Sequence, residues 1–172
     1  ARKFDVIIGW SLGGQLATLL VDQISKQYQQ QKTLITLASN PSFVQHEEWH
    51  NAMDQPTFQN FKQSFEHDVI ATLRKFGFMV CQGTAISKQD FVTLQSLIQP
   101  QNLDILKQGL NCLEQLNTVS ILKNYAGHQY HLFAKQDFLV SYKVMENIQK
   151  LNAKFLDAEL ISGSHGFPVF QF

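Results

Sequence analysis

A serine flanked by glycines lies near the start of the chain. Residues 9–13 read Gly-Trp-Ser-Leu-Gly, which matches the Gly-x-Ser-x-Gly pattern of a nucleophilic serine on a strand-to-helix turn. The bend is strained, and only glycine leaves room there for the backbone. The N–H of the next residue begins the helix and points at the oxyanion that forms on an attacked carbonyl. We therefore predict Ser11 as a nucleophile and the Leu12 backbone as an oxyanion donor.

Two later residues complete this chemistry. A serine hydroxyl is a weak nucleophile unless a base takes its proton and a carboxylate orients that base. On this kind of turn the acid follows the serine in the chain, and the histidine comes last. Asp137 follows a predicted strand over 130–134, and His165 follows one over 158–161. Because parallel strands end at one edge of a sheet, we predict a catalytic triad of Ser11, Asp137 and His165.

The segments around these residues have an α/β pattern. Residues 4–8 and 33–38 are short, apolar and rich in β-branched side chains, as in buried parallel strands. Residues 16–28 have the period of a helix. The residues expected on its apolar face are Leu16, Leu19, Leu20 and Ile24. A helix over 144–151 separates the two strands named above, so the sheet continues after a long interruption.

We interpret the segment that interrupts the sheet as a helical lid. From residue 43 to about 122 the apolar residues recur at helical spacing, and Pro56 and Pro100 mark helix starts. We predict an α/β core over 1–43 and 117–172, with a four-helix lid over 44–116. An acyl pocket requires mainly apolar walls, although most lid aromatics are expected to pack within the lid itself. The candidates for substrate contact are Trp10, Phe58, Phe61, Phe65 and Phe76.

The composition excludes several classes of partner. Lys and Arg total 14, as do Asp and Glu, so the formal net charge is zero. Such a chain has no global field for nucleic acid or an anionic membrane surface, and it has no apolar run of the 18 residues that a membrane span needs. Cys81 and Cys112 lack zinc-site spacing and are expected to be buried free thiols, which fits a cytoplasmic location. We expect a monomer without a metal or cofactor.

One motif competes with this interpretation. Residues 46–50 read His-Glu-Glu-Trp-His and fit H-E-x-x-H, a zinc-protease signature. That signature needs a long helix that holds both histidines, and a third ligand. Here the motif closely follows a predicted strand and Pro41, so we interpret it as a polar segment leading into the lid, with Trp49 packed against it. The remaining histidines, expected at the surface or in the core, are His67, His128 and His131.

Several stretches resemble a known family. They are GWSLGG at 9–14, LASNPSF at 37–43, EW at 48–49, TLRKF at 72–76, LKQGL at 106–110, DFLV at 137–140 and GSH at 163–165. Together they resemble the pimeloyl-acyl carrier protein methyl ester esterases of biotin synthesis, in the α/β-hydrolase superfamily. The resemblance implies an α/β-hydrolase fold with a parallel sheet and an inserted four-helix lid. It also implies a serine carboxylesterase that frees the pimeloyl carboxylate and releases methanol.

The resemblance also implies a partner. Acyl carrier protein is acidic, and the family meets it with basic residues on the lid. Between residues 69 and 89 this chain has Arg74, Lys75 and Lys88 and no acidic residue. These three are the docking candidates, and the alternative is an ordinary solvated basic face. Ala71 and Val92 lie near positions where the family carries further arginines.

The chain departs from the family at its start. Only ten residues precede Ser11, whereas the family has several upstream strands, on the order of 70 residues at about 20–30 per strand–helix unit. That upstream part carries the loop with the second oxyanion N–H. We therefore expect a fragment of a longer protein, without its N-terminal strands and with an incomplete oxyanion hole. The alternatives are a general short-chain carboxylesterase and a non-catalytic scaffold of the same fold.

Overall fold

The computed structural model describes residues 3–171. Four parallel strands form one sheet in the order β1-β2-β3-β4. The strands are β1 (Val6–Trp10), β2 (Thr33–Leu37), β3 (Gln129–Ala134) and β4 (Leu156–Ile161). The helices are α1 (Leu12–Tyr28), α2 (Gln55–His67), α3 (Val69–Cys81), α4 (Ser87–Leu97), α5 (Leu103–Gln115), α6 (Val119–Asn124), α7 (Lys143–Gln149) and α8 (Phe167–Phe170).

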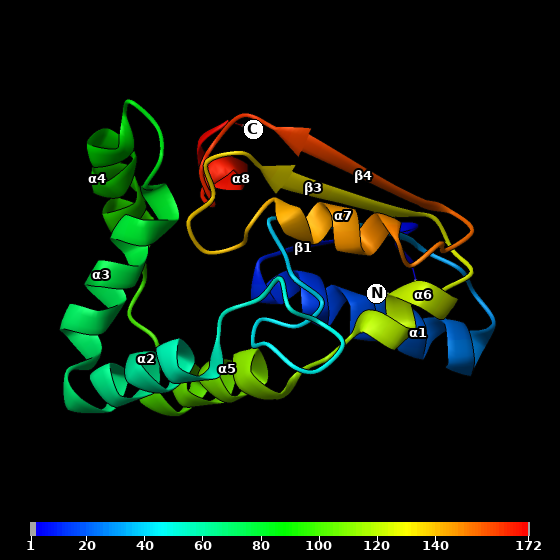
Figure 1. Ribbon diagram of the computed structural model, residues 1–172, viewed down its shortest axis with the longest axis horizontal. Helices are drawn as coiled ribbons and strands as arrows, with labels where there is room; N and C mark the ends of the chain where they lie inside the picture. Colours follow the sequence, from blue (N-terminus) through cyan, green and yellow to red (C-terminus); the bar gives the residue numbers. More distant parts are fainter. Residues whose placement is uncertain (1–2, 172) are drawn as a thin grey trace.

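The sheet register brings the predicted functional loops to one edge. Trp10 pairs with Leu37, Leu37 pairs with Leu132, and the last residues of β3 and β4, Ala134 and Ile161, are also partners. All four strands are parallel, so the loops after β1, β2, β3 and β4 leave the same side. In Figure 1 the arrowheads of β3 and β4 point toward the side where α3 and α8 lie. The predicted α/β arrangement is confirmed.

One face of the sheet carries the main hydrophobic core. Leu34 and Phe133 are fully buried there against α1, α6 and α7. The buried apolar side of α1 consists of Ala17, Val21 and Ile24, whereas Leu16 is 47% exposed. The predicted apolar face of this helix was therefore wrong at Leu16. Ala17, Val21 and Ile24 follow one another at helical spacing on one side of α1, and Leu16 lies outside that stripe.

In the described residues, the opposite face of the sheet is open toward the starts of the strands, whereas near their carboxyl ends Phe167 of α8 clusters with Ala134, Leu37 and Leu132. Val6, Ile8 and Tyr130 are 44%, 60% and 39% exposed, and the register aligns Ile8 with Ile35 and Tyr130 in one row across the strands. Alternate residues on a strand point to opposite faces, so these side chains share the face away from α1. The two faces of the sheet thus differ sharply in how far their apolar side chains are buried.

Helices α2 to α5 form an angular arm beside the sheet (Figure 1). Their starts carry typical capping residues: Asp54 caps α2, Asp68 caps α3 and Asn102 caps α5, each accepting a backbone N–H. The arm has its own small core, in which Phe58, Phe65, Val44 and Leu110 are buried. The predicted helical character of this segment is confirmed.

The end of α3 joins this arm to the sheet. Val80 and Cys81 are buried and pack with Trp10 and Leu139, which lie at the carboxyl edge of the sheet. The N–H of Gly166 donates to the Val80 carbonyl at 2.9 Å. The arm is thus attached beside the loop that contains His165. Within residues 3–171, no helix is long and apolar enough to cross a membrane.

Candidate active site

The structure brings Ser11, His165 and Asp137 together at the carboxyl edge of the sheet. His165 Nε2 lies 2.9 Å from Ser11 Oγ, and His165 Nδ1 lies 2.8 Å from Asp137 Oδ2. The side chains of the histidine and the aspartate are each only 1% exposed. With the ring proton on Nδ1, the tautomer that the carboxylate favours, Nε2 accepts the serine proton. This is the arrangement of an activated serine nucleophile.

The serine occupies a strained backbone conformation between β1 and α1. Its φ is 53° and its ψ is −124°, a combination that costs free energy in any residue but glycine. A Cβ at Gly9 would lie 2.1 Å from the Gly13 carbonyl oxygen, which explains why the motif requires glycine at position 9. The Ser11 N–H donates to the Leu37 carbonyl at 2.9 Å. The turn is therefore held by the neighbouring strand β2.

The aspartate is fixed by its own loop. Asp137 Oδ1 accepts the backbone N–H groups of Leu139 and Val140, both at 2.8 Å. Oδ2 is thereby directed to His165, because the two carboxylate oxygens have separate partners. Gln136 and Gly163 bond to each other twice, through Gln136 N–H to the Gly163 carbonyl at 3.0 Å and Gly163 N–H to Gln136 Oε1 at 2.8 Å. These contacts clamp the two loops together.

Trp10 holds the histidine loop. Its indole N–H donates to the His165 carbonyl at 3.0 Å, and the two rings are 5.8 Å apart. The sequence suggested Trp10 as a substrate contact, and no feature of the sequence pointed to this hydrogen bond. The residue supports the position of His165, and its predicted substrate contact stays a prediction.

Leu12 begins α1 directly after the serine. The first four N–H groups of a helix have no acceptor within the helix, and the helix dipole makes this end electropositive. The Leu12 N–H is therefore placed where one donor of an oxyanion hole is expected.

The predicted acyl-pocket aromatics have different surroundings. Phe58 and Phe65 are 3% exposed and belong to the core of the helical arm, so their burial gives no support to a role in substrate binding. Phe61 and Phe76 are partly buried, with ring centroids 5.8 Å apart. Phe76 also packs against the buried cluster of Val80, Cys81 and Leu94, against which Trp10 packs as well.

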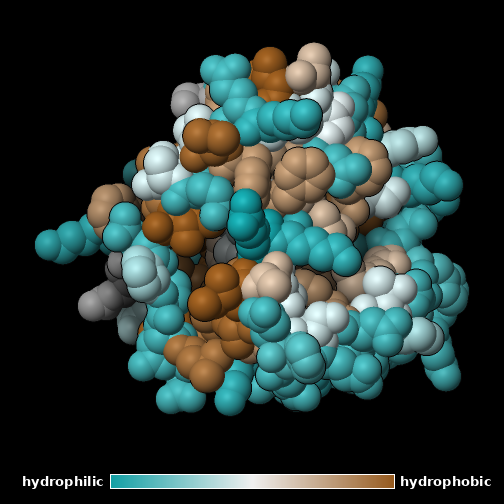
Figure 2. Space-filling model, turned by 90° about the vertical axis from the view of Figure 1, so that its left-hand side faces the viewer, coloured by the Kyte–Doolittle hydropathy of each residue, from teal (hydrophilic) through white to brown (hydrophobic). Residues whose placement is uncertain are grey.

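The candidate docking cations lie on the outer arm. Arg74 and Lys75 on α3 and Lys88 on α4 are exposed. Apolar side chains on the same helices are exposed as well, with Ile70 at 82% and Val92 at 69%. Figure 2 shows this side of the molecule, where brown apolar side chains interrupt the teal polar surface in several places. The surface of the arm is thus of mixed apolar and basic character.

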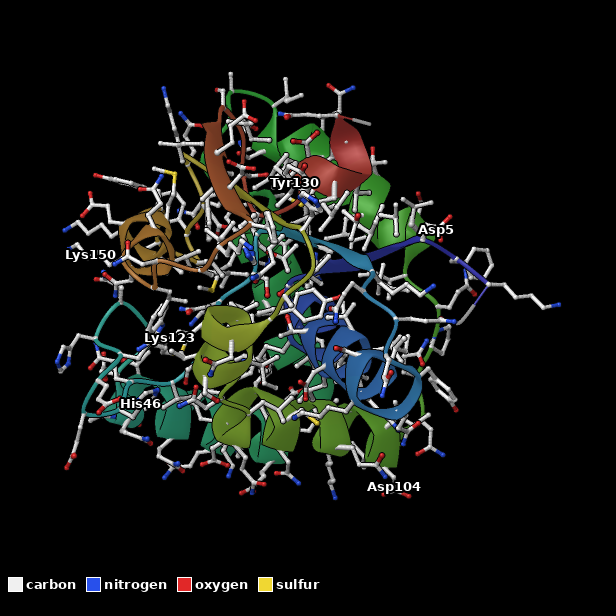
Figure 3. All side chains as sticks on the ribbon, turned by 90° about the vertical axis from the view of Figure 1, so that its right-hand side faces the viewer. Asp5, His46, Asp104, Lys123, Tyr130 and Lys150 are labelled. Atoms are coloured by element: carbon white, nitrogen blue, oxygen red, sulfur yellow. The ribbon has the colours of Figure 1, made fainter. Side chains whose placement is uncertain are left out.

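A hollow on the surface lies away from the triad. It has a volume of about 830 Å³ and is lined by the segment after β2 and by α6 and α7. His46, Lys123 and Lys150 border it, as Figure 3 shows. The competing zinc motif is located here, but it is not helical: His46 and Trp49 form an isolated β-bridge. Within the described residues no cluster of three or more metal-ligating side chains occurs.

The cysteines offer no alternative nucleophile at the site. Both are free thiols. Cys81 is completely buried, and that burial, followed by the negative charge of Asp90, raises the pKa of its thiol to about 11. A thiol with so high a pKa stays protonated near neutral pH and is a poor nucleophile. Cys112 is only partly buried, in contrast to the expectation of two buried thiols.

Curated relatives of the chain include a biotin-biosynthesis protein and a pimeloyl-[acyl-carrier protein] methyl ester esterase. The chain is 31% identical over 156 residues to the "Biotin biosynthesis bifunctional protein BioHC" of Teredinibacter turnerae, covering 84% of this chain and 27% of that protein. It is 28% identical over 158 residues to the "Pimeloyl-[acyl-carrier protein] methyl ester esterase" of Vibrio vulnificus, covering 88% of this chain and 59% of the relative. The resemblance expected from the motifs is confirmed. No protein-family model matches the chain.

Solved structures show the same fold. An esterase from Exiguobacterium antarcticum superposes with a TM-score of 0.75 at 15% identity, covering 95% of this chain and 60% of that structure. The chain therefore has the α/β-hydrolase fold, and it spans about three fifths of the length of such a protein.

Proposed function

Starting from a chain with the α/β-hydrolase fold and relatives among the pimeloyl-acyl carrier protein methyl ester esterases, we propose that it supplies the triad of a serine carboxylesterase. The observation that carries the proposal is the continuous chain of contacts from Ser11 through His165 to Asp137. Each of these three residues is needed to activate the serine hydroxyl. The proposed substrate is the methyl ester of a pimeloyl group on acyl carrier protein.

The first half of the reaction acylates the serine. Ser11 Oγ attacks the ester carbonyl carbon while its proton passes to His165 Nε2. Asp137 keeps the ring oriented and stabilises the imidazolium that forms. The negative charge that develops on the carbonyl oxygen is met by the Leu12 N–H at the start of α1. When the tetrahedral intermediate collapses, His165 returns the proton to the leaving methoxide, and methanol departs.

The second half frees the enzyme. A water molecule gives its proton to His165 Nε2 and attacks the acyl carbon on Ser11 Oγ. Collapse of this second intermediate breaks the bond to Ser11, which recovers the proton from His165. The product is the free distal carboxylate, still attached to its carrier at the other end. No residue of the triad is consumed.

Support for the carrier-bound substrate comes from the relatives' names and from the arm. The basic residues Arg74, Lys75 and Lys88 are exposed on α3 and α4, and an acidic carrier would be attracted to them. Phe76 and Trp10 both pack against the buried cluster of Val80, Cys81 and Leu94, which joins this arm to the site. A cytoplasmic, monomeric enzyme belongs to the same proposal, and the free thiols support its location.

A covalent probe tests the nucleophile. In the protein as the cell makes it, an organophosphonate should modify Ser11, and Ser11→Ala should abolish the labelling. Ser162→Ala provides the matched control, since Ser162 lies on the loop of His165 but outside the triad. Persistent labelling in Ser11→Ala would contradict the assignment. Faster turnover of a free short-chain ester than of carrier-bound pimeloyl methyl ester would favour the general carboxylesterase instead.

A further inference from the structure

Beneath the nucleophile turn lies a group of buried polar side chains that the proposed reaction does not use. Gln15, Thr36, Ser39 and His131 are between 1% and 5% exposed. They come from α1, from β2 and the residues after it, and from β3. Burial of a polar group costs free energy unless it is hydrogen-bonded, so their partners indicate what these residues hold in place.

Ser39 holds the backbone of the nucleophile. Its hydroxyl donates to the Ser11 carbonyl oxygen at 2.7 Å, and the Gly14 N–H donates to the same oxygen at 2.9 Å. The Ser11 conformation, with φ at 53°, persists only if the surroundings enforce it. The Ser39 bond is a long-range contact that does so, because it ties the turn after β1 to the segment after β2.

The position of Ser39 is itself set by the sheet. The preceding residue, Ala38, has φ at 45° and donates its N–H to the Leu132 carbonyl of β3 at 2.8 Å. A Cβ at Gly14 would lie only 2.3 Å from Ser39 Oγ. The glycine therefore makes room for the hydroxyl, and the close approach leaves Ser39 little freedom to move.

Two atoms of the group lack a direct partner. His131 Nδ1 lies 2.7 Å from Thr36 Oγ1, whereas His131 Nε2 has no hydrogen-bond partner. Gln15 Nε2 donates to the Pro41 and Leu116 carbonyls, whereas Gln15 Oε1 has none. Both residues line one internal cavity of about 10 Å³, and Ser39 lines it too. A polar cavity of that size accommodates about one water molecule.

The hydrogen-bonding capacities match a single water. Burial lowers the pKa of His131 to about 4, so the ring is neutral near pH 7. If the Thr36 hydroxyl donates to Nδ1, the ring proton is on Nε2 and needs an acceptor. Gln15 Oε1 needs a donor. A water accepts from His131, donates to Gln15 and has a second hydrogen for the Ser39 oxygen, which makes the three bonds typical of buried water.

We propose that Ser39 is a positioning residue for Ser11 and that one buried water joins it to His131 and Gln15. Resting on the proposed function, this inference deepens it: the geometry of the nucleophile depends on a polar network that reaches from α1 to β3. Ser39 does not touch the substrate. It acts through the Ser11 carbonyl, and thereby on the directions of Ser11 Oγ and the Leu12 N–H.

A matched pair of variants tests the positioning role. Ser39→Ala is compared with Ser42→Ala in the protein as the cell makes it. Ser42 is also buried, 4% exposed, and its hydroxyl likewise donates to a backbone carbonyl, that of Val44, at 2.8 Å. Both variants should lower Tm by similar amounts. Only Ser39→Ala should lower kcat, by between about tenfold and a hundredfold with KM unchanged, and should slow phosphonate labelling of Ser11 by the same factor.

The outcomes separate this inference from the proposed function. Equal labelling rates in wild type, Ser39→Ala and Ser42→Ala would overturn the positioning role while leaving the nucleophile in place. If wild type is not labelled at all, the proposed function fails. The ¹³C shift of the Ser11 carbonyl, measured by NMR, still decides the positioning role: it should change in Ser39→Ala and stay constant in Ser42→Ala.

NMR of His131 tests the water. Its ¹⁵N shifts should report a neutral ring protonated on Nε2, and the Nε2 proton should exchange slowly and give a cross-peak to a bound water. A proton on Nδ1, or an Nε2 proton without any contact to water, would overturn the bridging water. Gln15→Leu removes one partner and should weaken the cross-peak, with the Ser42→Ala variant as the control that keeps it.

Discussion

The sheet part of the molecule and the helical arm hold their predicted functional residues in different ways. In the sheet part, which comprises the four strands with α1, α6, α7 and α8, three residues far apart in sequence meet within 2.9 Å of their partners. In the arm of α2 to α5, Phe58 and Phe65 are buried in a separate core, and the candidate docking cations are dispersed over its surface. The proposed catalytic residues thus lie in the sheet part, and the proposed carrier contacts lie in the arm.

Backbone contacts explain the difference. The Ser11, Asp137 and His165 loops are bound to one another and to the strands through main-chain hydrogen bonds, such as Ser11 N–H to the Leu37 carbonyl and Gln136 N–H to the Gly163 carbonyl. The arm has its own caps and core, and it meets the sheet part around Val80 and Trp10 and where α5 lies against α1. Substitutions at the triad in the sheet part should therefore change mainly kcat. Substitutions in the arm should change mainly the stability of the arm or its association with a carrier.

The largest expected effect is on catalysis by the sheet part. His165→Ala removes the base and should lower kcat by roughly 10⁴-fold or more, with little change in KM. Combining it with Ser11→Ala should add almost nothing, since triad residues act as a unit. Steady-state kinetics on the protein as the cell makes it provides the measurement, and an additive second loss would show that the two residues do not share one step.

The next effect concerns the stability of the arm. Phe58→Ala should lower the free energy of unfolding by about 3–5 kcal/mol, because it leaves a cavity in a small core. Hydrogen exchange should show the loss in the amides of α2 and α5 and spare those of β2 and β3. Phe138→Ala serves as the control, since Phe138 is 59% exposed. Equal loss of protection in both parts would show that they unfold together and would break the comparison.

The sheet part should also respond to acid through His131. The folded pKa is about 4, below the ordinary value of 6.5, so between these values the unfolded chain binds the extra proton. Stability therefore rises with pH across this window and falls as the pH drops from 6.5 toward 4, by on the order of 3 kcal/mol. Urea titrations of wild type and His131→Asn measure it. The difference in the free energy of unfolding between the two proteins should change between pH 4 and 6.5. A difference that stays constant over this pH range would exclude the effect.

The smallest expected effect belongs to the outer arm. Reversing the charges of Arg74, Lys75 and Lys88 should slow association with an acidic carrier by a few fold, mainly through kon, and the loss should shrink as salt screens the attraction. Turnover of a small free ester should stay unchanged. Charge reversal at Lys26, an exposed lysine on α1, provides the control. A loss on both esters would indicate damage to the fold rather than to docking.

The local pattern of the sequence was enough to predict much of this protein. The nucleophile turn is encoded within five residues, because glycine is needed where a side chain would strike the Gly13 carbonyl. The four strands appear as short apolar runs, and their order places Asp137 and His165 after the last two of them. These are short-range properties of the chain combined with the rule that parallel strands end together.

Other features were decided by tertiary packing. Which residues of α1 are buried depended on which side of the helix packs against the sheet, so Ala17 and Val21 face inward while Leu16 does not. The bonds from Ser39 to Ser11 and from Trp10 to His165 span 28 and 155 residues. A pattern of residue types does not encode such partners, because a hydroxyl or an indole finds its acceptor only after the strands have fixed which loops lie side by side.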